Sequence, residues 1–228
     1  MRIYKNLTLI GTSHIAIESI KEVERTILQL QPNIVALELD KPRLESLLHK
    51  GKTKLKLSDI KILGIKGFLF NIFAGWIERK LGKLVGVTPG DEMLKAVETS
   101  KKINAKIKLI DQPINITLKR LSQTITWKEK FKFAGDLIKG FIFRKEIIKF
   151  DLTKVPPKEL IQRMMEELKE RYPSVYLTLI EERNIYMAKN LYKLIKLYNE
   201  ERIIAVIGAG HEQELLDLIK QNEQKNNL

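Results

Sequence analysis

The chain of 228 residues contains no cysteine. Disulfide frameworks, thiolate metal sites and cysteine nucleophiles are therefore excluded. Histidine is also scarce, with three residues, so a metal ion would have to bind histidine, aspartate or glutamate. The sequence has no Gly-x-Gly-x-x-Gly, phosphate-loop, His-Glu-x-x-His or Gly-x-Ser-x-Gly motif, and these absences remove several common enzyme classes.

Long hydrophobic runs are missing as well. Residues 1–6 are polar, and the apolar run that follows, residues 7–10, is shorter than the core of a secretory signal peptide. The most apolar stretch, residues 60–87, is interrupted by charged side chains and falls short of the roughly 18 uncharged residues that a spanning helix requires. We therefore predict a cytoplasmic protein, and association with a membrane surface stays open.

Basic residues outnumber acidic ones, 41 to 28, which gives a net charge of +13. Such a charge permits nucleic acid, anionic lipid or acidic substrates as partners. Most of the excess is lysine spread along the chain, which is typical of a solvated surface and gives little support to nucleic-acid binding. The hydrophobic fraction of 44% is sufficient for a packed core.

The hydrophobic pattern predicts an α/β fold. Four short runs rich in branched aliphatic residues predict buried parallel strands at 7–10, 34–39, 107–110 and 203–207. Helical spacing over residues 17–30 completes a βαβ unit between the first two strands. Further helices are expected at 114–124, 127–143, 157–171 and 174–198. The expected architecture is a central, mainly parallel sheet flanked by helices.

We expect a single domain over residues 1–220 and a disordered tail over 221–228. Two segments rich in aromatic and basic residues, approximately 55–87 and 126–150, predict a helical cap or insert. Such a cap would lie over the carboxyl ends of the strands, where open α/β sheets bind ligands. Uncovered apolar helices in the cap would favour a dimer or another homo-oligomer.

Two of the three histidines lie in matching Gly-x-x-His turns, Gly11 to His14 and Gly208 to His211. Each turn directly follows a predicted strand. Because glycine allows a sharp backbone turn, each histidine can project across the carboxyl end of the sheet. Either histidine alone could cap a helix or satisfy a core hydrogen bond, but the matched pair favours a shared functional site.

Glu38 lies inside the apolar run of the second predicted strand, where a charged group needs a partner. We expect this strand to neighbour the one that ends at His14. A His, Glu, His set made of His14, Glu38 and His211 could then surround a divalent cation. The alternative is a salt bridge to Arg43 or a helix cap.

Arg183 lies on the apolar face of the last long predicted helix, where its charge requires a carboxylate. Glu38, Glu92 and Asp111 are the candidate partners, and Arg183 would be a structural clamp or a group that stabilises an oxyanion. Glu92 lies in the first turn of a helix, which the helix dipole also explains. Asp111 could cap the following helix, and Arg120 on that helix could be a surface residue.

Taken in order, these motifs resemble the TraB family, which includes the pheromone-shutdown proteins. The resemblance covers about residues 7–213. The residues that carry it are Gly11-Thr12-Ser13-His14, Val35 to Asp40 with Arg43, Gly90 to Met93, Leu109 to Asp111 followed by Ile116 to Arg120, Glu182-Arg183-Asn184, and Gly208 to His211. Gln112 departs from the family pattern, which usually has arginine there.

The resemblance implies kinship with the Tiki metalloproteases and, more distantly, the erythromycin esterases, whose paired Gly-x-x-His turns and an acidic residue build the active site. His14, Glu38 and His211 would be the metal ligands, with Glu92, Arg120 and Arg183 around them. Tiki proteins are manganese- or cobalt-dependent peptidases, so the resemblance implies one of these metals, with zinc as an alternative, and a peptide substrate.

The spacing and the resemblance together favour a metal-dependent hydrolase, most simply a peptidase, with Glu92 as general base and Arg183 as oxyanion stabiliser. The alternative is a non-catalytic protein that binds or sequesters a peptide, including one that does so at a membrane surface.

Overall fold

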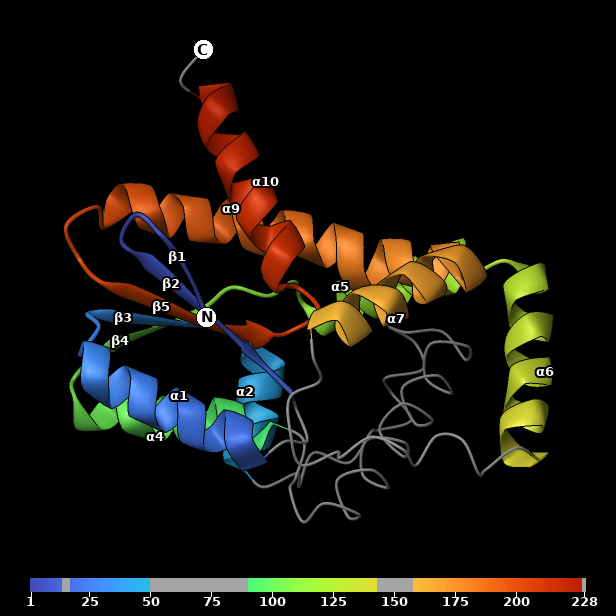
Figure 1. Cartoon of the computed structure of the whole chain (residues 1–228), viewed down its shortest axis with the longest axis horizontal. Coiled ribbons are helices and arrows are strands. Elements are labelled where there is room, and N and C mark those ends of the chain that lie inside the picture. Colours follow the sequence, from blue (N-terminus) through green and yellow to red (C-terminus); the bar gives the residue numbers. More distant parts are fainter. Residues whose placement is uncertain (14–16, 50–89, 143–157, 227–228) are drawn as a thin grey trace.

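The computed structural model describes residues 1–13, 17–49, 90–142 and 158–226. His14, the predicted segment 55–87 and residues 143–150 lie outside these ranges. The described chain folds around a five-stranded sheet with the strand order β1-β2-β5-β3-β4 (Figure 1). The strands are β1 (Arg2–Tyr4), β2 (Leu7–Thr12), β3 (Ile34–Leu37), β4 (Lys106–Leu109) and β5 (Ile203–Gly208).

The predicted parallel sheet is confirmed. β5 pairs in parallel with β2 on one side and β3 on the other, and β3 pairs in parallel with β4. The sequence did not indicate β1, a short strand that pairs antiparallel with β2 at the edge. The expectation that the strand before Glu38 neighbours β2 was wrong, because β5 lies between them. All six residues of β5 are buried, and a central position covers such a strand on every side.

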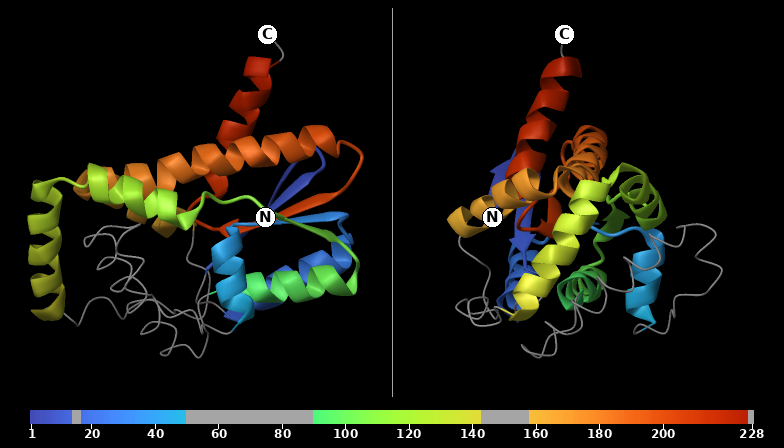
Figure 2. Two further views of the ribbon diagram at one scale, coloured as in Figure 1. Left: turned by 180° about the vertical axis from the view of Figure 1, so that it is seen from behind. Right: turned by 90° about the vertical axis from the view of Figure 1, so that its right-hand side faces the viewer.

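Helices cover both faces of the sheet, as the two views in Figure 2 show. One face carries α1 (Ile17–Leu30) and α4 (Asp91–Lys102), and the other carries α9 (Glu182–Leu197) and α10 (Glu212–Asn226). The remaining helices are α2 (Lys41–Leu48), α5 (Ile114–Thr124), α6 (Trp127–Ile142), α7 (Lys158–Arg171), α8 (Pro173–Tyr176) and the π-helix η2 (Leu177–Glu181). None of the described helices is both long and apolar enough to cross a membrane.

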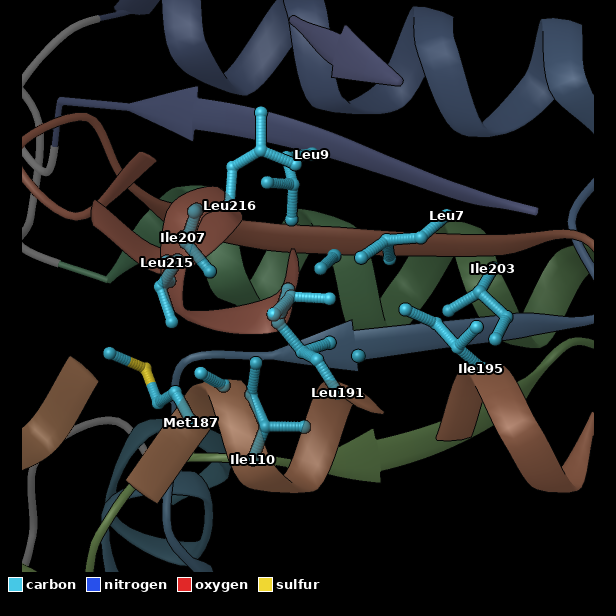
Figure 3. Packing of buried hydrophobic residues seen from close by; sticks show 14 of the residues in the cluster. Leu7, Leu9, Ile110, Met187, Leu191, Ile195, Ile203, Ile207, Leu215 and Leu216 are labelled. Carbon is cyan, nitrogen blue, oxygen red and sulfur yellow. The ribbon is translucent and has the colours of Figure 1, made fainter. Parts of the chain in front are cut away.

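The two faces bury separate hydrophobic clusters. Leu7, Leu9 and Ile203 of the sheet pack with Met187 and Leu191 of α9 (Figure 3), and residues of α10 join them. On the opposite face, side chains of β3 and β5 pack against α1 and α4. This double coverage explains why the runs of β3 and β5, which are buried throughout, are continuously apolar rather than alternating.

The C-terminal helix is longer than the sequence indicated. A disordered tail was expected from residue 221, but α10 continues through Asn226. Glu223 in this part of the helix accepts hydrogen bonds from the hydroxyl of Tyr4 and the ammonium of Lys5. These contacts tie the last turns of α10 to the N-terminal hairpin, which reduces their fraying.

Candidate functional site

The strands that precede the two Gly-x-x-His turns end side by side. Thr12 pairs with Gly208 in the parallel register, and the backbone N–H of Ala209 donates to the carbonyl of Thr12 at 2.8 Å. A Cβ atom added to Gly11 would lie 3.2 Å from the Cα of Ala209, so glycine permits this close approach of the two turns. His14 itself is outside the described residues.

Glu38 follows β3 at the same edge of the sheet and is 4% exposed. Its Oε2 accepts the backbone N–H of Gly208 at 2.6 Å, and its Oε1 accepts a hydrogen bond from Arg183. The Nε2 of His211 lies 3.4 Å from the same Oε1. The central position of β5 therefore places the second histidine turn, rather than the first, directly beside Glu38.

Arg183, the buried arginine of α9, binds two of the three predicted carboxylates. Its guanidinium donates to Glu38 and to both oxygens of Asp111, with Nε and Nη2 at 3.1 and 2.7 Å from Asp111. Nη1 donates to the carbonyl of Leu179 in the π-helix, at 3.0 Å. Burial lowers the pKa of an arginine, but Glu38 and Asp111 outweigh that effect and raise the pKa of Arg183. Arg183 therefore has the carboxylate partners that its place on an apolar helix face predicted.

Arg43 belongs to the same network but does not pair with Glu38 as the alternative interpretation proposed. It donates to Asp111, and its Nε lies 3.1 Å from Asp40. Asp40 also binds the backbone N–H of Ile114 at 2.6 Å, at the start of α5. Asp40, not Asp111, thus satisfies the first N–H of that helix.

His211, 6% exposed, is held from its other side by Asn184, which the sequence indicated only within the Glu182-Arg183-Asn184 motif, and Asn184 in turn contacts Glu214. Its Nδ1 lies 2.6 Å from Oδ1 of Asn184, and Nδ2 of Asn184 donates to Glu214 at 2.8 Å. Tyr176 donates to Glu214 at 3.4 Å, and burial, followed by the charge of Glu214, raises the pKa of Tyr176. A signal for Asn184 was present, because it shares the helical period of the buried residues Ala188 and Leu191.

The remaining predicted residues, Glu92 and Arg120, lie on α4 and α5. Glu92 is 1% exposed in the first turn of α4. Arg120 is exposed on α5, where its Nη2 pairs with Glu182 at 2.5 Å. The structure thus joins Glu38, Arg183 and His211 by direct contacts, whereas Arg120 occupies the surface position that was its alternative interpretation.

Glu38 and His211 bring a carboxylate oxygen and an imidazole nitrogen within 3.4 Å of each other, and both are donor types that divalent metal ions bind. Gly208 and Asn184 orient the two side chains from behind, as outer partners do in metal sites. Within the described ranges no group of three His, Asp or Glu side chains could hold a metal ion, and the third predicted ligand, His14, lies outside them.

A cavity of about 720 Å³ lies next to the two turns. Gly11, Ala209 and Gly210 border it on the side of the sheet, Met165 on the side of α7, and Glu214 on the side of α10. Its volume lies within the range of sites that bind small molecules or short peptide segments.

These features define an α/β protein with a buried Glu–Arg–His cluster at the carboxyl edge of its sheet. The model of the TraB/PrgY/gumN family matches residues 4–226, and the chain belongs to this family.

Among its relatives, the uncharacterized protein MJ1365 of Methanocaldococcus jannaschii is 36% identical, over 98% of this chain and 55% of that protein. TraB domain-containing proteins of mouse and human are each 25% identical, over 89% of this chain and 60% of their own length. The chain therefore spans little more than half of the length of these relatives.

Proposed function

We propose that this chain is a metal-dependent hydrolase that acts on peptides, with a divalent cation held by His14, Glu38 and His211. The observation that carries the proposal is the pair of Nε2 of His211 and Oε1 of Glu38, 3.4 Å apart and buried. Manganese or cobalt is the proposed metal, with zinc as an alternative. A cation in such a site supplies Lewis acidity toward a carbonyl and activates a water molecule.

The side chains around the proposed metal ion would have separate roles. Glu38 and His211 orient one face of the site, and Arg183 fixes the carboxylate of Glu38 through its own bonds to Asp111. Arg183 shares its positive charge between the two buried carboxylates of Glu38 and Asp111, which offsets part of the cost of burying them. Glu92 is the proposed general base, and Arg120 lies further out on α5.

A substrate segment would lie in the cavity beside Gly11 and Gly210. There the side chains of α7 and α10 that line the cavity would contact the substrate. The burial of Glu38 and His211 limits competing water.

The test combines metal analysis with turnover. The protein is purified without chelator, and its metal content and its hydrolysis of a peptide library are measured for the wild type, His14→Ala and His211→Ala. His49→Ala is the matched control, because His49 is an exposed residue at the end of α2. We expect wild type and His49→Ala to retain about one metal ion per chain and the other two variants to lose both metal and activity. Stoichiometric metal in both of those variants would overturn the proposed site.

The cavity also supports a second candidate function, capture of a peptide without hydrolysis. In that case peptides would bind with an affinity that does not change when a chelator removes the metal, and no cleavage product would form. Fluorescence anisotropy with labelled peptides, measured with and without chelator, separates the two functions.

A further inference from the structure

Asn184 occupies a position where its amide cannot rotate freely. It is fully buried at the start of α9, so each of its polar atoms needs a partner. Its Nδ2 lies 2.8 Å from the carboxylate of Glu214, and its Oδ1 lies 2.6 Å from Nδ1 of His211. One end of the amide therefore contacts a carboxylate, and the other end contacts a histidine ring.

These contacts determine which nitrogen of His211 carries hydrogen. A carboxylate only accepts hydrogen bonds, so the NH₂ group of Asn184 must face Glu214. The amide oxygen then faces His211, and because an amide oxygen also only accepts, Nδ1 must donate. In the neutral ring Nε2 is left with its lone pair, 3.4 Å from Oε1 of Glu38.

We propose that Asn184 and Glu214 are positioning residues that hold His211 in the Nδ1–H tautomer and present Nε2 as a metal ligand. The inference rests on the proposed function for the metal, but the tautomer itself does not depend on it. Tyr176 supports the arrangement from outside, since its hydroxyl donates to the same Oε2 of Glu214 that accepts from Asn184.

The same hydrogen bonds could instead serve only to join α9 to α10. Isosteric variants separate the two roles. In Glu214→Gln the new amide can donate or accept, so the Asn184 amide is free to turn over while a bond between the helices remains. Adding Asn184→Asp to it restores a group that only accepts beside His211, and it also restores the net charge. Asp217→Asn is the matched control, because Asp217 borders the same cavity on α10 and bonds to Gln213 instead.

The first measurement is the tautomer of His211 in the metal-free protein. Long-range ¹H–¹⁵N spectra are recorded at a pH at which the ring is neutral, and the three histidines are assigned with the variants His14→Gln and His49→Gln. We expect the Nδ1–H form in the wild type and in Asp217→Asn, a mixture of tautomers in Glu214→Gln, and the Nδ1–H form again in the double variant. An Nε2–H wild type, or an unchanged tautomer in Glu214→Gln, would overturn the proposal.

The second measurement is the affinity for Mn²⁺ by calorimetry. Loss of an outer partner of a ligand typically weakens metal binding about 10- to 100-fold, so we expect a loss of that size in Glu214→Gln and recovery in the double variant. Equal affinities in the wild type and Glu214→Gln would overturn the positioning role. If the wild type itself binds no metal, the proposed function fails, and the tautomer series still decides whether Asn184 and Glu214 fix His211.

Discussion

Replacing Arg183 by methionine removes the cation that joins Glu38 to Asp111. The side chain of Arg183 is 15% exposed, and the side chains of Glu38 and Asp111 are 3% and 0% exposed. Breaking a buried ion pair by removing one partner costs about 3–5 kcal/mol. Here Asp111 would keep Arg43 and the N–H of Gln112, and Glu38 would keep the N–H of Gly208. Because these partners remain, we expect the free energy of unfolding to fall by an amount near the lower end of this range, about 3 kcal/mol.

Such a loss lowers the melting temperature by roughly 6–12 °C for a domain of this size. Urea unfolding followed by circular dichroism gives the free energy directly. Because the pKa of Arg183 is raised, its contribution is fully present below the ordinary arginine pKa and is lost only as the pH rises through the folded value. The difference between wild type and variant should therefore stay constant between about pH 6 and pH 9.

Arg120→Met is the matched control, because it makes the same substitution in the exposed pair with Glu182, and exposed pairs contribute little. If Arg183→Met unfolded at the same urea concentration as Arg120→Met, the reasoning about the buried clamp would be refuted. Adding Glu38→Gln to Arg183→Met should cost less than the sum of the two single changes, because the double variant also removes the carboxylate charge that Arg183 had balanced.

Three further predictions concern other parts of the fold. Glu129→Gln should lower the free energy of unfolding by about 1 kcal/mol at pH 7. The carboxylate of Glu129 accepts the backbone N–H of Thr126 at the start of α6 and the backbone N–H of Ser174. Burial opposes ionisation of Glu129, but these bonds outweigh it and lower its pKa, so in pH-dependent urea unfolding the loss should disappear as the pH falls through the lowered pKa of Glu129. Gly90→Ala should lower the unfolding free energy by about 1–2 kcal/mol, because Gly90 has φ 92°; an unchanged thermal midpoint would contradict this. Leu191→Ala should lower the free energy of unfolding, measured with urea, by about 2–5 kcal/mol, because Leu191 is buried. Leu197→Ala, at an exposed position of the same helix, should leave it nearly unchanged.

The central strands β3 and β5 could be predicted because they are buried on both faces and therefore read as continuous apolar runs. The order of the strands could not, since it depends on which long-range pairing is most favourable, and no local pattern encodes that. β1 was missed for the opposite reason: Arg2–Tyr4 is a short, partly exposed edge strand with little hydrophobic signal.

The charged residues of the site could be predicted because burying a charge costs free energy. An acid such as Glu38 or a cation such as Arg183 inside an apolar pattern needs a partner, and the structure pairs these two directly. Asn184 was indicated only as part of the Glu182-Arg183-Asn184 motif. Its contact with His211 was not predicted, because burying an uncharged amide costs less free energy than burying a charge and gives a weaker signal in the sequence. The short link between His211 and Glu38 also depended on the unpredicted position of β5.

The position of β5 has a consequence for the order in which the protein can fold. β2 and β3 do not pair with each other, because β5 lies between them, and the N–H of Gly208 at the end of β5 binds Glu38 across 170 residues of sequence. During synthesis the edges of β2 and β3 that pair with β5 stay open until β5 has left the ribosome. Closing so long a loop slows folding, and it makes insertion of the last strand the event that completes both the sheet and the site.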